Sequence, residues 1–350
     1  MGLIKLPEKS INYFKNHLDE IFNSGNLSEG PWNKKISEFV KDLTDARSAL
    51  PTNSNGAGMI ALLTYYRHYH GRTKVLIQSN TMYGVKTMVY AGGCELSGFI
   101  PCQLETLMPT IQDVKDVIEP LNQIEKNKLV IILSHIGGII NPDIEKIAEL
   151  CKDENIILLE DCAHSFGATF YGKHSGLFGN GGVYSFYATK AIPAGEGGVI
   201  VTNNQKLGEI ISSYSIYDRF EQKLEIGNNI RISEVQALLT FSILREWKNI
   251  INNKQIMAEQ YMKVCNAENI RYISQNKNGH NGNYYKFVIY CKEFPIGESF
   301  PTLITKTSGV YDYSIGIPNH IAFHHACLPI WYGQEAGITN NVIKELKLIK

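Results

Sequence analysis

A lysine, a carboxylate and a glycine turn stand close together in the middle of the chain. Asp161 follows an apolar run that is typical of a buried strand, and Ser185 and Lys190 lie five residues apart just after the next such run. The turn Gly195 to Gly198 comes directly behind the lysine. A lysine amine can form a Schiff base with an aldehyde. A buried carboxylate requires a positively charged or hydrogen-bonding partner, because an unpaired buried charge is costly.

These groups are the ones that pyridoxal 5'-phosphate (PLP) chemistry requires. The aldehyde of the cofactor needs an amine, the pyridine nitrogen needs an acid that keeps it protonated, and the phosphate needs dipoles and hydroxyls. We therefore predict that Lys190 is the Schiff-base lysine and that Asp161 is the partner of the pyridine nitrogen. Once free, the amine of Lys190 could also move a proton between the substrate carbon and C4′ of the cofactor.

Other residues near this segment are candidates for binding the same cofactor. His164 could lie on the ring or bond its phenolic oxygen, and Ser185 could bond the phosphate. Asn55, Gly56 and Ala57 open an expected helix, whose first backbone N–H groups would stabilise an anion. Asp161, His164 and Ser185 each have a purely structural alternative: a salt-bridged core aspartate, a satisfied core histidine and an ordinary serine at the end of a strand.

Strands and helices are expected to alternate through the middle of the chain. Apolar runs predict strands at 75–77, 129–133, 156–159, 183–186 and 198–202, and helical patterns lie at 83–91, 111–119, 143–151 and 204–217. This alternation predicts an α/β fold with a mostly parallel sheet and helices on both faces. Ligands bind at the carboxyl ends of such strands, where Asp161 and Ser185 are placed.

The two ends of the chain differ from this middle part. Helices are expected at 8–25 and 33–44, from the turn at 53–58 through Tyr69, over 233–265 as one long helix, and at 340–349. Residues 284–290 alternate like a strand. We predict an N-terminal segment with a large cofactor-binding domain over 1–249, and a smaller α+β domain over 250–350.

Composition excludes several classes of protein. The 350 residues are 44% hydrophobic and 19% charged, and Lys+Arg and Asp+Glu both number 34, so a nucleic-acid partner is not expected. The apolar run at 129–140 is too short to span a bilayer, and the first residues lack a signal-peptide core, so no membrane partner is expected. Seven scattered cysteines without Cys-x-x-Cys spacing favour a reducing cytoplasm.

Two other motifs were weighed. Gly176, Gly179 and Gly181 could suggest a dinucleotide loop, but their order is wrong and a strand rather than a helix is expected to follow. The group His320, His324, His325 and Cys327 could suggest a metal, but a second pair of ligands is missing. We therefore predict neither a dinucleotide site nor a metal site.

With these motifs the chain resembles the DegT/DnrJ/EryC1/StrS family, also called the sugar aminotransferase family, of fold-type I PLP enzymes. The resemblance runs from Leu27 to Leu239 and is most specific at 160–168, 185–202 and 227–237. It implies the fold of the aspartate aminotransferases, with Lys190 and Asp161 in the roles given above. His164 would stand beside the ring and Ser185 would bind phosphate. Asn229 would reach the phosphate of the neighbouring subunit, which implies a homodimer with shared active sites.

The chain departs from the family pattern at two cofactor positions. The usual Ser-Gly-Thr phosphate turn is Asn55-Gly56-Ala57 here, so one hydroxyl is missing and backbone contacts must replace it. The family's ring-covering aromatic follows a threonine, whereas Thr81 is followed by Met82 and then by Tyr83. Either Met82 or Tyr83 could cover the ring.

The resemblance implies an aminotransferase. The amino donor would be an amino acid, with L-glutamate first, and the acceptor a nucleotide-linked keto-deoxy sugar used for a surface glycan. An alternative acceptor is a small phosphorylated ketone such as dihydroxyacetone phosphate, because the C-terminal region is short. A non-catalytic regulator with a PLP fold is a further alternative, against which the complete set of Asp161, His164, Ser185 and Lys190 argues.

Overall fold

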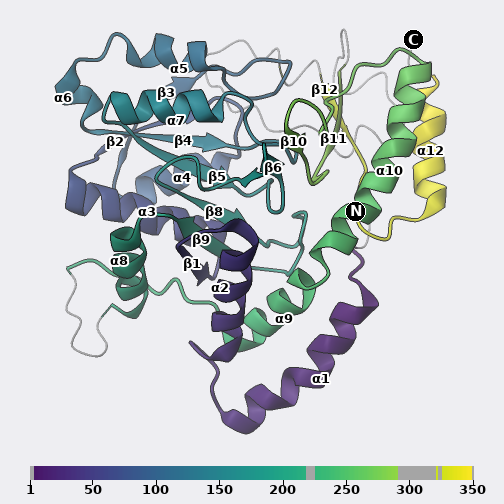
Figure 1. Cartoon of the computed structure of the whole chain (residues 1–350), viewed down its shortest axis with the longest axis horizontal. Coiled ribbons are helices and arrows are strands. Elements are labelled where there is room, and N and C mark those ends of the chain that lie inside the picture. The colour runs from purple at the N-terminus through teal and green to yellow at the C-terminus, as the bar shows by residue number, and fades with distance from the viewer. Residues whose placement is uncertain (1–3, 218–224, 291–320, 322–324, 349–350) are drawn as a thin grey trace.

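The computed structural model describes residues 4–217, 225–290, 321 and 325–348. His320 and His324, which were weighed as metal ligands, lie outside the described residues. Figure 1 shows a central sheet surrounded by helices, with the C-terminal helices to one side of it.

The central sheet has seven strands in the order β1-β9-β8-β5-β4-β2-β3. The strands β8, β5, β4, β2 and β3 run parallel to one another, and β9 is antiparallel to both β8 and β1. The sheet is therefore mostly parallel, as predicted. The bounds are β1 Ser48–Thr52, β2 Lys74–Gln78, β3 Glu95–Ile100, β4 Leu129–Ser134, β5 Ile157–Cys162, β8 Gly181–Ser185 and β9 Gly198–Thr202.

Helices cover both faces of the sheet, and β4 shows this directly. Val130 and Ile132 pack into a hydrophobic cluster with α3 and α4, whereas Ile131 and Leu133 pack into another with α5 and α7. A strand that is buried on both faces reads as a continuous apolar run, which is why β4 and β5 were predictable. The helices before β9 are α1 Glu8–Ser24, α2 Pro31–Thr44, α3 Asn55–His70, α4 Tyr83–Ala91, α5 Ile111–Ile118, α6 Gln123–Lys126 and α7 Ile144–Asp153; α8 Gln205–Ile216 follows β9.

The two edge strands, β1 and β3, were not predicted from the sequence. Strand β1 contains Pro51 and β3 contains Gly98, and both residues are uncommon within strands. Each of these strands has a neighbour on one side only. Its residues therefore show mixed burial, and its sequence lacks a continuous apolar run. Edge strands of this kind carry little periodic signal.

The prediction of one long helix over 233–265 is wrong. The chain forms α9 Glu234–Leu244 and α10 Trp247–Ala267, with a tight turn at which the Glu246 N–H donates to the Ile243 carbonyl at 3.0 Å. Helix α9 packs against α1 and α2, whereas α10 packs against α12 (Figure 1). Because the residues on both sides of the turn are good helix formers, local spacing does not reveal the change in direction.

The C-terminal part has a hydrophobic cluster of its own. Helix α10 and the closing helix α12, Ala336–Leu346, pack beside the hairpin of β11, Phe287–Tyr290, and β12, His325–Leu328. A small second sheet joins β6 Thr169–Phe170, β7 Lys173–His174 and β10 His280–Asn281. The predicted domain boundary at residue 250 falls within α10, and the division into two domains stays a prediction.

A buried carboxylate joins the N-terminal segment to α9. Glu234 is fully buried and accepts hydrogen bonds from the backbone N–H groups of Trp32 at 2.9 Å and Asn33 at 3.0 Å. These N–H groups open α2, where a negative charge is stabilised by the helix dipole. The Glu234 N–H also donates to the Leu27 carbonyl at 3.0 Å, and Ser28 forms a β-bridge with Ser233, so the segments 27–33 and 233–234 lie side by side.

In the parts of the chain that the structure describes, every helix is too short or too polar to cross a bilayer. The six described cysteines are all buried.

Candidate active site

Asp161 lies near the carboxyl end of β5 and is only 6% exposed. Its Oδ1 accepts hydrogen bonds from the Asn55 amide at 3.2 Å and from the Ala163 N–H at 3.1 Å, and its Oδ2 accepts one from the Ser134 hydroxyl at 3.1 Å. All three donors are neutral, and no cation pairs with Asp161 within the described ranges. The structural alternative, a salt-bridged core aspartate, is therefore not observed there. A protonated ring nitrogen would fit this carboxylate.

The side chain of Asn55 is directed at Asp161. Its amide also donates to the Val183 carbonyl at 2.7 Å, so that it links β8 to the carboxylate. In the same turn, the Ala57 N–H donates to the Ser54 hydroxyl at 3.1 Å. A cavity of about 410 Å³ opens over Gly56 and Ala57. The turn thus offers space for an anion, whereas its asparagine side chain serves the predicted pyridine partner.

Lys190 stands on a tight loop between β8 and β9. The loop is closed by hydrogen bonds from the Ala188 N–H to the Gly195 carbonyl and from the Phe186 N–H to the Gly197 carbonyl, each 2.9 Å. Gly195 and Gly197 have φ of +89° and +136°, which a residue with a side chain rarely adopts. Glycine is therefore required at these two positions of the turn by the backbone conformation. Lys190 itself is half-buried.

His164 is half-buried and its ring packs against that of Tyr285, with the centroids 4.2 Å apart and the ring planes tilted by 34°. Burial, with the nearby ammonium groups of Lys190 and Lys286, holds the pKa of His164 well below its usual range, so the imidazole is neutral at pH 7. Its Nδ1 has no hydrogen-bond partner in the described part of the protein. A satisfied core histidine would have one there, so this nitrogen remains free for a ligand.

Tyr285 was not identified from the sequence. It precedes β11, more than a hundred residues beyond His164, and no motif marks it. Its ring is also contacted by Lys190, whose Nζ lies 5.2 Å from the ring centroid. The structure therefore brings the C-terminal part of the chain to Lys190, the predicted Schiff-base lysine.

Three further predicted residues lie around this centre. Ser185 is 6% exposed at the end of β8, and its hydroxyl accepts from the Tyr187 N–H at 3.3 Å. Met82 and Tyr83 lie at the start of α4 and are 41% and 47% exposed, so which of them covers the ring stays open. Thr81, just before them, hydrogen-bonds Ser134 at 2.8 Å, and Ser134 in turn bonds Asp161.

Asn229 lies beside the same turn. It lines the 410 Å³ cavity over Gly56 and Ala57, and its carbonyl accepts a hydrogen bond from the Asn53 amide at 3.3 Å. This asparagine is exposed. Its predicted role toward the phosphate of a neighbouring subunit stays a prediction.

His135, Glu160 and Cys162 form a buried cluster that has the composition of a metal site. Glu160 is, however, already saturated: it accepts from His135 Nε2 at 2.9 Å and from three backbone N–H groups at 2.7 Å each. His135 Nδ1 accepts the Asn141 N–H at 3.1 Å, which places the imidazole hydrogen on Nε2. The cluster is therefore a clamp that ties the glycine-containing loop 176–179 to the strand carrying Asp161.

This clamp gives a stability prediction. We expect Glu160→Gln to lower the free energy of unfolding by about 2–3 kcal/mol, because the amide NH₂ would face buried donors that lose their acceptor. Urea unfolding at fixed protein concentration measures the change. Glu119→Gln, an exposed carboxylate, is the matched control and is expected to stay within about 0.5 kcal/mol of the parent protein. An equal midpoint for both variants would contradict the role of the clamp.

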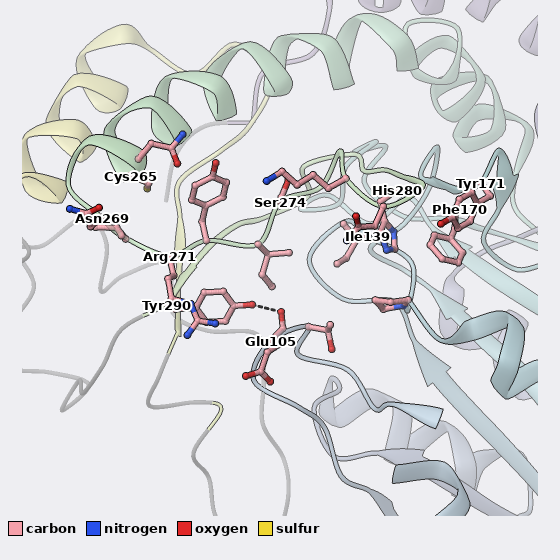
Figure 2. A pocket seen from close by; sticks show the side chains of 18 residues that line it. Glu105, Ile139, Phe170, Tyr171, Cys265, Asn269, Arg271, Ser274, His280 and Tyr290 are labelled. Carbon is pink, nitrogen blue, oxygen red and sulfur yellow. Dashed lines mark hydrogen bonds between the residues drawn. The ribbon is translucent and has the colours of Figure 1, made fainter. Parts of the chain in front are cut away.

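A second, larger cavity of about 790 Å³ lies between the loops of the sheet and the C-terminal part. Figure 2 shows Arg271, Tyr290 and Glu105 at its wall, where the Tyr290 hydroxyl donates to the Glu105 carbonyl. None of the site residues predicted from the sequence is among the described residues that line it. It is distinct from the centre around Lys190.

Comparison with solved structures confirms the fold. The chain superposes on Helicobacter pylori PseC, an aminotransferase involved in the biosynthesis of pseudaminic acid, with a TM-score of 0.83 at 17% identity, covering 98% of this chain and 96% of that one. It superposes on a Streptococcus pneumoniae protein proposed to be a sugar aminotransferase, in its PLP form, with a TM-score of 0.82 at 14% identity, covering 99% and 97%. The predicted fold-type I architecture is thereby confirmed.

Sequence comparison identifies the relationship. GDP-perosamine synthase of Escherichia coli O157:H7 is 27% identical over 269 residues, which cover 75% of this chain and 70% of that protein. The UDP-4-amino-4,6-dideoxy-N-acetyl-beta-L-altrosamine transaminase of Helicobacter pylori is 26% identical over 255 residues, which cover 70% of this chain and 65% of the transaminase. The model of one family matches residues 9–306. The chain belongs to the DegT/DnrJ/EryC1/StrS aminotransferase family.

Proposed function

We propose that this protein is a PLP-dependent aminotransferase that moves an amino group from an amino acid, with L-glutamate first, to the keto group of a nucleotide-linked keto-deoxy sugar. The product would serve surface-glycan biosynthesis. The observation that carries the proposal is the buried carboxylate of Asp161, which has three neutral donors and no cation partner within the described residues. Membership of an aminotransferase family supplies the reaction class.

The residues around Asp161 fit the cofactor. Asp161 would hold the ring nitrogen, His164 would lie beside the ring with its free Nδ1, and the turn at 55–57 with Ser185 would hold the phosphate. When bound, PLP supplies an electron sink for the carbon that loses its proton. Lys190 would hold the cofactor covalently, and its freed amine would carry the proton between the substrate and the cofactor. Asn55 and Ser134 keep the Asp161 carboxylate oriented.

A homodimer with shared sites is part of the proposal. Large apolar side chains near the predicted site are exposed in the single chain: Met82, Tyr83, Tyr90 and Tyr187. Exposed apolar groups of this kind mark interaction surfaces, and a second copy would cover them. Asn229, next to the phosphate turn and exposed, would then contact the neighbouring subunit's cofactor.

The acceptor is inferred from the relatives. The names of the two curated relatives describe enzymes of nucleotide-sugar metabolism. Dihydroxyacetone phosphate or a similar small phosphorylated ketone remains the alternative acceptor. A cytoplasmic location belongs to the same proposal, because seven scattered cysteines without Cys-x-x-Cys spacing favour a reducing compartment.

An absorbance spectrum of the purified protein with PLP, before and after addition of L-glutamate, tests the proposal. We expect a visible band from covalently bound cofactor, which moves to the near-ultraviolet with glutamate. Incubation of that form with nucleotide keto-sugars, and separately with dihydroxyacetone phosphate, then identifies the acceptor by return of the visible band. A protein that PLP cannot colour would contradict the proposal, and return of the band with the small ketone alone would favour the alternative.

A further inference from the structure

Three lysines surround one aromatic ring beside the predicted cofactor site. The Nζ atoms of Lys190, Lys254 and Lys286 lie 5.2, 5.9 and 5.0 Å from the centroid of the Tyr285 ring. Lys190 comes from the loop after β8, Lys254 from α10, and Lys286 from the segment next to Tyr285 itself. Only tertiary contacts bring the three together, so the concentration of positive charge is a property of the folded protein.

Lys254 is in an unfavourable environment as the chain stands. It is 3% exposed, and within the described residues neither Lys254 nor Lys286 has an ion pair. Burial, and to a smaller extent the positive charge of Lys286, lowers the pKa of Lys254 to about 7. A buried ammonium without a counter-ion is costly, so a bound anion would stabilise this group.

The described side chains near Lys254 and Lys286 do not neutralise the positive charge of these two lysines. Asp161 already accepts three hydrogen bonds, and His164, which packs against Tyr285, contributes no negative charge. Lys190 is the reactive amine. Lys254 and Lys286 are therefore available for an anion that enters with a substrate.

We propose that Lys254 and Lys286 form an anion subsite that holds a carboxylate of the amino donor. The inference rests on the proposed function, because it assumes that an amino acid reacts at Lys190. The position of the cations favours the donor over the acceptor. They lie against the same ring as the reactive amine, and the α-carboxylate of an amino acid is bonded directly to the reacting carbon. The phosphoryl groups of a nucleotide-linked sugar lie across the sugar ring from a keto group at C3 or C4.

The first experiment follows the donor half-reaction by the loss of the visible band in PLP-loaded protein. We expect Lys254→Met and Lys286→Met each to raise the half-saturating L-glutamate concentration about 10- to 100-fold, which is the size of one charge-assisted hydrogen bond. Lys254→Arg should restore most of the affinity. Lys248→Met is the matched control, since Lys248 is exposed on the same helix α10.

A binding measurement separates recognition from turnover. Calorimetric titration with succinate, a dicarboxylate that lacks an amino group, should give a Kd that rises by a similar factor in both methionine variants and stays unchanged in Lys248→Met. Lys286→Met changes a half-buried residue, so it remains informative if Lys254→Met folds poorly.

The outcomes distinguish the possibilities. Unchanged affinity for glutamate and succinate in both methionine variants would overturn the subsite. A defect confined to the acceptor half-reaction would also overturn it, and would assign the lysines to an acceptor phosphoryl group instead. Failure of the proposed function has a different signature, because the parent protein would then show no visible band with PLP or no spectral change with any amino acid.

Discussion

Lys190→Ala is expected to lower the turnover number at least about 10⁴-fold, because one substitution removes both the predicted nucleophile and the group predicted to move the proton. The cofactor would then be held only by non-covalent contacts, so the visible band of the covalent form should disappear. Steady-state turnover and the absorbance spectrum of the PLP-loaded protein measure the two effects. A small primary amine added in solution should restore part of the activity.

Lys146→Ala is the control for this substitution. Lys146 is an exposed lysine on α7, paired with Asp143 at 2.9 Å, and its loss should leave both turnover and spectrum unchanged. If Lys190→Ala retained the visible band, another lysine would have to hold the cofactor. Lys254 would be the first to examine, because it lies against the same aromatic ring.

Asp161→Asn is expected to lower the turnover number about 10²- to 10³-fold, the usual cost of removing one preorganised electrostatic contact from an active site. The substitution keeps the shape of the side chain but removes the negative charge that would hold a protonated pyridine nitrogen. It also places an NH₂ group where the carboxylate accepts from Asn55, Ser134 or Ala163. Activity should fall while Lys190 still binds the cofactor covalently.

The spectrum again separates mechanism from folding. In Asp161→Asn the visible band should remain, but its intensity should change with pH around a different midpoint, because the charge on the ring nitrogen alters the acidity of the bound cofactor. Asp116→Asn, an exposed carboxylate on α5, is the control and should behave as the parent. A midpoint equal to that of the parent would mean that Asp161 does not face the ring.

Much of the fold was predictable because the buried strands in the interior of the sheet are continuous apolar runs in the sequence. Strands β4 and β5 are buried on both faces and read as apolar runs. Helices alternate with these strands along the chain. Helix α1 ends at Gly25, whose φ of +67° is the left-handed conformation that glycine favours at the end of a helix. The edge strands β1 and β3 lack such runs, and the break between α9 and α10 has no local signal, so these were missed.

The candidate site was predictable to the extent that it is local. Asp161, His164, Ser185 and Lys190 lie within thirty residues and stand at the ends of neighbouring strands, so their spacing alone places them on one edge of the sheet. The direction of the Asn55 side chain was not predictable. The sequence indicated only that the backbone N–H groups of the turn at 55–57 could bind phosphate, and it gave no role to the Asn55 side chain, whose amide donates to Asp161 and the Val183 carbonyl.

The amino-acid sequence was enough to predict a mostly parallel sheet and to single out Lys190 and Asp161 as candidate site residues, because apolar runs, strand ends and glycine turns are encoded by neighbouring residues. The surroundings of these two residues followed from the tertiary structure alone. Tyr285, Lys254 and Lys286 come from a part of the chain that packs back against the sheet. Contacts between residues so far apart depend on how helices and hairpins pack, which no local spacing specifies.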